Sequence, residues 1–174
     1  MDETLTITPV IESDSLYSGE GRREFEATPP GSYRMSLTSN IRVKRTKAGQ
    51  AKLSAFFSHT DPVARGRYKG VEVTAMLEGT DKNGKSLARQ FGDMLVALGI
   101  SKADVLANAA TVRQDTTLSS IPEDEQWKGV PATILLNGDA INDSLVGREA
   151  IVIVEANEFN GKVNFRANGI YPAN

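Results

Sequence analysis

The sequence predicts a mainly β domain: an antiparallel barrel of five or six strands, with a helix inserted between the third and fourth strands. Three observations predict this fold. Polar and apolar residues alternate with a period of two around residues 31–44, 53–57 and 71–77. Apolar residues recur at helical spacing between residues 87 and 98. Strand-like stretches return after residue 130, so the helix falls inside the set of strands.

The first elements are a polar arm and a long hairpin. Residues 1–30 are polar and contain Gly19-Glu20-Gly21 and Pro29-Pro30, and we expect residues 1–29 to form a flexible arm in front of a domain that covers residues 30–174. In the first strand the odd-numbered positions are apolar and the even-numbered ones polar, which predicts one buried and one wet face. The turn Lys47-Ala48-Gly49-Gln50 leads into the second strand.

The later elements follow from turns and helix signals. A basic loop over residues 59–69 precedes the third strand, and Gly99 is placed to end the main helix. Ser101 with Asp104 predicts the start of a short second helix. We expect irregular structure at residues 110–126 and then strands at residues 130–136 and 150–156 and from residue 163 through 168, the last ended by Pro172. This order suits a small closed barrel of the oligonucleotide-binding (OB) type, and an antiparallel sandwich with an appended helix is the alternative.

Composition excludes several classes of function. The 174 residues include no cysteine, so disulfides and thiol-bound metals are excluded. The single histidine, His59, excludes a multi-histidine metal site, and we expect it in a polar loop. No Gly-x-Ser-x-Gly elbow or Walker motif is present, so we expect a non-enzymatic protein without cofactor or metal. No apolar run approaches a membrane span, and the acidic start is unlike a signal peptide, so we expect a cytoplasmic protein.

Positive charge is concentrated in one segment. Residues 22–69 hold eleven Lys and Arg against three acidic residues, a net charge of +8 in a chain whose total is −2. The rest of the chain therefore carries −10. Such a basic lobe on an acidic protein is the electrostatic footprint of a polyanion-binding surface.

Binding single strands without sequence preference needs cations for the phosphates and exposed rings for the bases. The rings that best fit this role are Phe56, on the polar parity of its strand, and Tyr68, inside the basic loop. We expect Phe165 in the core and Trp127 to pack a loop onto the barrel. The predicted nucleic-acid contacts are Arg34, Arg42, Lys44, Arg45, Lys47, Lys52, Phe56, Arg65, Arg67, Tyr68, Lys69 and Arg166.

Several motifs also occur together in a recognisable order. They are Pro30-Gly31-Ser32-Tyr33, Lys47-Ala48-Gly49, the Leu87–Gly99 helix, Leu145-Val146-Gly147-Arg148-Glu149, Glu158-Phe159-Asn160-Gly161-Lys162 and Tyr171-Pro172. Over residues 29–172 the chain resembles a phage family of OB-fold single-stranded-DNA-binding proteins, formerly a domain of unknown function. Residues 111–143 are longer and more polar than in that family, and the C-terminus has no acidic tail for recruiting partners.

The sequence thus supports two kinds of function. The first is a sequence-independent single-stranded-DNA-binding protein of phage replication or recombination, acting in the host cytoplasm. Its partners would be single-stranded DNA, replication or recombination proteins and, in a homo-oligomer, further copies of the chain, with no membrane. The alternative is a phage structural, assembly or interaction protein with a β-rich fold.

Overall fold

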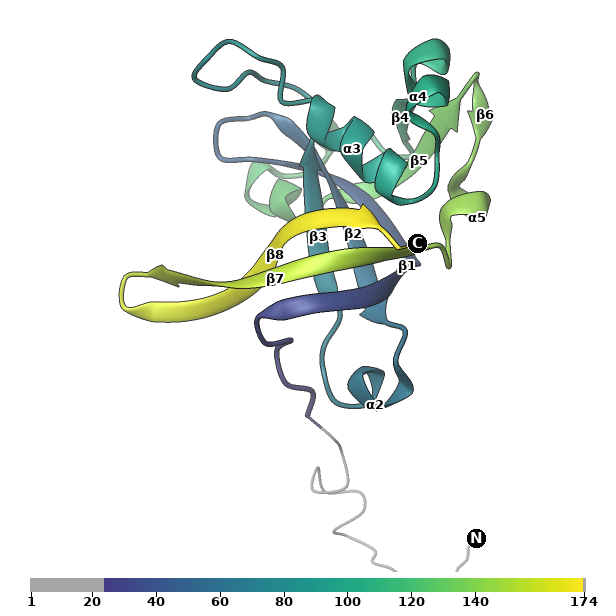
Figure 1. The fold of residues 1–174 in the computed structure, drawn as a ribbon. Coiled ribbons are helices and arrows are strands. Elements are labelled where there is room, and N and C mark those ends of the chain that lie inside the picture. The colour runs from purple at the N-terminus through teal and green to yellow at the C-terminus, as the bar shows by residue number, and fades with distance from the viewer. Residues whose placement is uncertain (1–23, 174) are drawn as a thin grey trace, which may run out of the picture.

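The structure is a computed structural model that describes residues 24–173 (Figure 1). Most of the predicted arm, residues 1–23, lies outside the described residues. The fold is mainly β, with short helices. In chain order the elements are β1 (Gly31–Arg45), β2 (Ala51–His59), α2 (Pro62–Arg65), β3 (Val71–Met76), α3 (Arg89–Ala97), α4 (Lys102–Asn108), β4 (Thr111–Gln114), η1 (Leu118–Ser120), η2 (Glu123–Lys128), β5 (Val130–Leu136), β6 (Asp139–Ala140), α5 (Asn142–Leu145), β7 (Glu149–Phe159) and β8 (Lys162–Pro172).

The first three strands form an antiparallel meander. β1 pairs with β2 and β2 pairs with β3, in a register that sets Val43 opposite Leu53 and Leu53 opposite Ala75. These apolar side chains share one face, as the period of two predicts, and they are buried. The turn at residues 46–50 closes the first hairpin, and Gly49 has φ +82°, which favours glycine.

β1 is the strand around which the sheet bends. Its register with β2 shifts between Leu37 and Ile41, which marks a bulge opposite Phe56. Before the bulge, β1 pairs on its other side with β7, and after the bulge it pairs there with β5. One strand therefore belongs to two differently directed parts of the sheet.

The resulting sheet has eight strands and is open. The predicted barrel had five or six strands and was closed. Within residues 24–173 the hydrogen-bonded order is β3-β2-β1-β5-β4, with β7 branching from β1 and β8 pairing with β7 alone. β8 lies beside β3, but no strand pairing joins them. The chain thus curls toward closure without completing the ring of hydrogen bonds.

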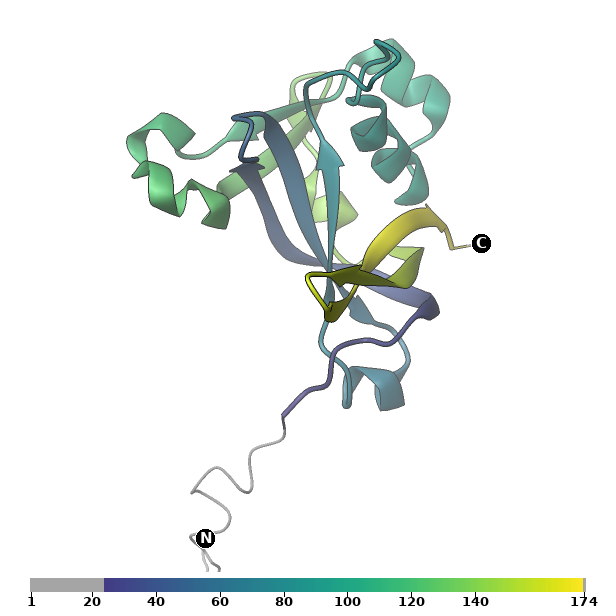
Figure 2. The ribbon, with the colours of Figure 1, turned by 90° about the vertical axis from the view of Figure 1, so that its left-hand side faces the viewer.

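The core lies between the inner face of this curled sheet and α3. Met35, Leu37 and Phe57 on the strands are fully buried, and Met94 and Leu95 bring α3 against them. α3 contacts both β3 and β8 and therefore covers the inner side of the meander (Figures 1 and 2). The opposite, outer face of β1, β2 and β3 faces away from α3.

Helix signals in the sequence are reproduced in the structure. Gly99 follows α3 with φ +96°, and Ser101 caps α4 by accepting a hydrogen bond from the Asp104 N–H at 3.0 Å. Residues 110–126 were predicted to be irregular, but they contain β4 and two 3-10 turns. The short α2 in the basic loop was also not predicted. Within the described residues, no helix is both long and apolar enough to cross a membrane.

Two aromatic residues differ from expectation. Phe165 was predicted in the core but is 41% exposed. The β7–β8 hairpin lines the core near its base, but its far end, which carries Phe165, extends beyond the core. Trp127 was predicted to pack a loop onto the barrel, but at the end of η2 it is 62% exposed. The alternation in β8 did not show that the hairpin extends beyond the core. The position of Trp127 in a loop did not show that its ring stays exposed.

Candidate nucleic-acid interface

The candidate interface is the outer face, defined here by the even-numbered side chains of β2, of β3 and of the part of β1 that follows its bulge. The pairing sets Lys44 opposite Lys52 and Arg42 opposite Ser54 on the β1–β2 side. On the β2–β3 side it sets Phe56 opposite Glu72. Neighbouring strands are about 4.8 Å apart, so these side chains form one continuous surface. Four residues of the predicted site lie on this surface: Arg42, Lys44, Lys52 and Phe56.

The centre of the outer face is a small polar network. The Lys44 ammonium forms a short ion pair with the Glu72 carboxylate, and the fully buried Ser54 donates a hydrogen bond to the same carboxylate oxygen at 2.5 Å. Lys44 Nζ also lies 5.9 Å from the centre of the half-buried Phe56 ring. This network holds a largely buried cation, with the Lys44 side chain 16% exposed, beside a half-buried aromatic ring.

The pKa of the Glu72 carboxyl is lowered in this setting. Partial burial works to raise it, but hydrogen bonds from Lys44 and Ser54 and the positive charges of Lys44 and Lys52 outweigh the burial. The carboxylate therefore stays ionised among the cations. It binds the Lys44 ammonium, to which a phosphate oxygen could otherwise bind.

Further cations lie along and beyond the outer face. No hydrogen bond or ion pair within residues 24–173 engages the ammonium of Lys52, which acts on Glu72 only through its charge. At the β1–β2 turn, the Arg45 guanidinium donates to the Gly49 carbonyl at 2.7 Å and Lys47 is exposed. On the outer face and its turn, Lys52 and Lys47 are therefore the cations most available to an incoming phosphate.

Arg42, a predicted nucleic-acid contact, also makes contacts within the protein. Its Nε donates to the Lys128 carbonyl at 3.0 Å and its Nη2 to the Gly129 carbonyl at 2.9 Å. The guanidinium thus attaches the end of η2 to the outer face. Arg42 shapes the edge of the interface rather than presenting a free charge.

The predicted basic loop lies at the far end of the hairpin from the turn (Figure 1). α2 follows the last residue of β2, whereas the turn precedes its first, and the nine residues of β2 span roughly 30 Å. The α2 loop, residues 61–70, carries Arg65, Arg67, Tyr68 and Lys69. The two basic groups therefore border the outer face at opposite ends and do not form one cluster.

The α2 loop is attached to the segment that precedes β1. The Glu26 N–H donates to the Arg67 carbonyl at 3.0 Å, and the Lys69 N–H donates to the Glu26 carbonyl at 2.8 Å. The Glu26 carboxylate also accepts from Arg67 Nε at 3.1 Å. Residues 24–29, the described part of the predicted arm, are thus docked on the loop, and Arg67 already has an anionic partner.

His59 lies beneath this docked segment, and the prediction of a polar loop position was wrong. His59 is the last residue of β2 and is 2% exposed. The Tyr33 ring packs edge-on against its ring, with 5.0 Å between the two ring centres. Thr28 Oγ1 donates its one proton to the Lys69 carbonyl, so at 2.9 Å it accepts from His59 Nε2–H. Burial lowers the pKa of His59, against a smaller opposing effect of Asp61.

Tyr68 belongs to the same packing. Its ring lies 5.8 Å from the His59 ring on one side, and the Arg67 guanidinium lies 5.3 Å from it on another. The ring is half-buried. Tyr68 therefore serves the attachment of the α2 loop, which leaves Phe56 as the ring on the outer face.

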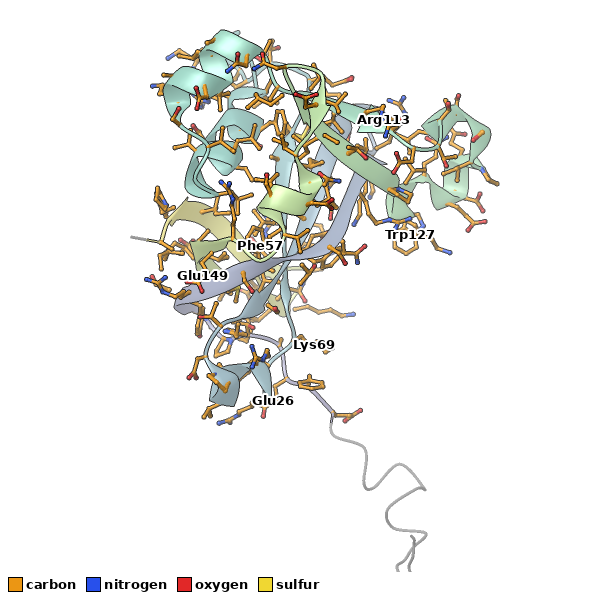
Figure 3. All side chains as sticks on the ribbon, turned by 90° about the vertical axis from the view of Figure 1, so that its right-hand side faces the viewer. Glu26, Phe57, Lys69, Arg113, Trp127 and Glu149 are labelled. Atoms are coloured by element: carbon orange, nitrogen blue, oxygen red, sulfur yellow. The ribbon has the colours of Figure 1, made fainter. Side chains whose placement is uncertain are left out.

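Two predicted contacts lie away from the outer face. Arg34, in the first half of β1, pairs with Glu149 at 2.5 Å and donates to the Ala173 carbonyl at 2.6 Å. Arg166 is exposed on the β7–β8 hairpin, opposite Glu155. Figure 3 shows Lys69 on a different part of the molecule from Glu149, the partner of Arg34, so the cations of the +8 segment do not all share one surface.

Comparisons with known proteins add no assignment. A scan against models of protein families finds no match, and a search of curated proteins finds no significant one. Within residues 24–173 no group of three or more His, Asp or Glu side chains could hold a metal ion.

Sequence reasoning missed three residues that shape the interface: Ser54, Glu72 and Trp127. Ser54 and Glu72 have the even parity of the wet face in adjacent strands, so parity alone could have placed them beside Lys44. Trp127 had no such signal, because its position depends on the contact between Arg42 and the end of η2.

Proposed function

We propose that this protein binds single-stranded DNA without sequence preference through the outer face. The observation that carries the proposal is the Lys44–Phe56 pair beside Lys52, on a continuous strand surface with basic groups at both ends. Lysines would neutralise phosphates, and Phe56 would stack on a base. Such combinations of a cationic groove with aromatic platforms are typical of single-strand binders.

The order of the strands supports an OB-like relationship. β1, β2, β3, β7 and β8, with α3 between the third and fourth of them, follow the sequence of elements of an OB fold, and OB barrels are partly open. OB folds bind oligonucleotides with the face of strands 2 and 3 and with the loops between strands 1 and 2 and strands 4 and 5. The outer face, the turn at residues 46–50 and the β7–β8 hairpin are the matching surfaces.

In this mechanism most of the affinity comes from counterion release. For single strands, the logarithm of the affinity falls with the logarithm of the salt concentration with a slope of about −0.7 per neutralised phosphate. Lys47, Lys52 and a Lys44 that exchanges Glu72 for a phosphate would account for about three such contacts. Duplex DNA, whose bases are stacked inward, would lose the contribution from Phe56.

The experiment is a fluorescence-anisotropy titration of labelled oligo-dT and of a duplex of equal length, each at two salt concentrations. We expect oligo-dT to bind more tightly than the duplex and its affinity to fall steeply with salt. Equal affinity for both, or tight binding that ignores salt, would contradict the proposal.

The biological setting is part of the proposal. A single-strand binder of this kind would act in phage replication or recombination in the host cytoplasm, with replication or recombination proteins as partners. The alternative, an assembly protein, is favoured by one observation: the β7–β8 hairpin exposes Phe159 on one face and Val163 and Phe165 on the other. A stable oligomer that forms without nucleic acid, measured by sedimentation, and dissociates on substitution of Phe159 would favour that alternative.

A further inference from the structure

The chain has one tryptophan, Trp127, and it stands exposed on a firmly held segment beside the outer face. We propose that Trp127 is a second base-stacking residue, which extends the path of the single strand from Phe56 across β1 onto η2. This inference rests on the proposed function. It names a contact in residues 111–143, outside the strands and loops on which that proposal depends.

The end of η2 is fixed against β1 by more than the Arg42 hydrogen bonds. Gly129 is buried, with φ +76°, and a Cβ there would come within 2.7 Å of the Val43 carbonyl oxygen and of the Lys44 side chain. The backbone of this segment therefore lies directly on β1 beside Lys44. Trp127 is two residues away from that contact, which places it at the edge of the outer face (Figure 3).

The other side of η2 is held as well. Gln126 Nε2 donates to the carbonyls of Leu118 and Ile121, each at 3.1 Å, and Leu118 is buried in the core. The segment around Trp127 thus has anchors before and after the ring. A large ring left 62% exposed between two anchors is pre-organised for contact with something outside the chain.

The charges around Trp127 favour a single strand whose phosphates lie on the side of β1, where Gly129 contacts the Lys44 side chain. Lys128 Nζ lies 5.7 Å from the Trp127 ring centre and also pairs with Glu125. Glu123 and Asp124 precede the ring and repel phosphates from that direction. Lys44 and Lys52 lie on the other side. A strand that keeps its phosphates over the outer face would therefore direct a base to Trp127.

The experiment uses the fact that Trp127 alone reports tryptophan emission. Unlabelled oligo-dT is titrated into the protein while emission and its quenching by iodide are recorded, and labelled oligo-dT affinity is measured in parallel by anisotropy. We expect oligo-dT to quench the emission and to shield the ring from iodide. Trp127→Ala should weaken oligo-dT binding by about 5- to 150-fold, and Trp127→Phe should restore most of the loss. Leu106→Ala, which removes another exposed large apolar side chain, on α4 and outside the surfaces assigned to binding, is the matched control and should leave the affinity unchanged.

The outcomes separate this inference from the proposed function. If oligo-dT binds but the emission, the iodide quenching and the affinity of Trp127→Ala all stay unchanged, the inference is wrong and the proposed function stands. If oligo-dT does not bind at all, both are wrong. If Trp127→Ala abolishes self-association and leaves oligo-dT affinity unchanged, the ring serves a protein contact, which also overturns the inference.

Discussion

The outer face and the α2 loop have similar compositions but different structures. Each combines lysines or arginines with one aromatic ring. On the outer face the ring of Phe56 lies under a lysine, and a single carboxylate holds that lysine in place. In the α2 loop the ring of Tyr68 packs against buried His59, and Arg67 pairs with the docked Glu26. Charge density along the chain therefore does not measure how available the charges are.

The largest difference between the two regions should follow charge reversal. We expect the pair Lys47→Glu and Lys52→Glu to weaken oligo-dT binding by about 100-fold at low salt, because both cations are available to phosphates. The pair Arg65→Glu and Lys69→Glu makes the same change in charge on exposed cations of the α2 loop, which lies at the far end of β2 from the turn, and should cost less than about tenfold. Anisotropy titrations of the two double variants, with Lys102→Glu on α4 as a distant control, test this. An equal loss in both would remove the distinction.

Truncation of the two rings should affect different properties. Phe56→Ala removes a stacking surface worth about 1–3 kcal/mol, so oligo-dT affinity should fall by about 5- to 150-fold. Tyr68→Ala should leave the affinity nearly unchanged and lower the free energy of unfolding by about 1–3 kcal/mol, because its ring packs on His59. Binding and urea unfolding of both variants are the measurements. A binding defect in Tyr68→Ala without loss of stability would reverse the assignment.

Glu72 offers a gain rather than a loss. Glu72→Gln keeps one acceptor oxygen, which can serve Ser54 and Lys44 as the single Glu72 oxygen does, but removes the negative charge that competes with phosphate. We expect oligo-dT affinity to rise by about three- to tenfold and the salt dependence to steepen, because Lys44 becomes available. Glu149→Gln, which frees Arg34 away from the outer face, is the matched control and should change neither quantity.

The smallest effect concerns pH and the docked segment. The pKa of His59 is lowered in the folded protein, so its contribution to stability is present above its unfolded pKa, about 6.5, and is lost as pH falls below that value. Urea unfolding at pH 7.5 and 5.5 should show a decrease toward acid that His59→Gln lacks. The change in oligo-dT affinity between pH 7.5 and 5.5 should be the same in the wild-type protein and in His59→Gln.

The sequence predicted the local elements better than their assembly. Alternation located β1, β2 and β3, and helical spacing located α3, because each of these elements buries one regular face. The short β4 and β6 depend on pairing with β5, a contact that no local pattern encodes. The sequence also did not predict that the basic residues lie on several surfaces. Alternation along a strand predicts which side chains share a face, but it does not predict which loops lie beside each end of that strand. The docking of residues 24–29 onto the α2 loop and the attachment of η2 by Arg42 are long-range contacts of the same kind.

Ultraviolet cross-linking of oligo-dT to the protein, followed by mapping of the linked residues, tests the central claim most directly. The outer face predicts cross-links at Phe56 and at Trp127 on its edge, and their loss in the Lys47→Glu, Lys52→Glu variant. Cross-links confined to Tyr68 and the α2 loop, or to the rings of the β7–β8 hairpin, would contradict the claim that the outer face binds the single strand.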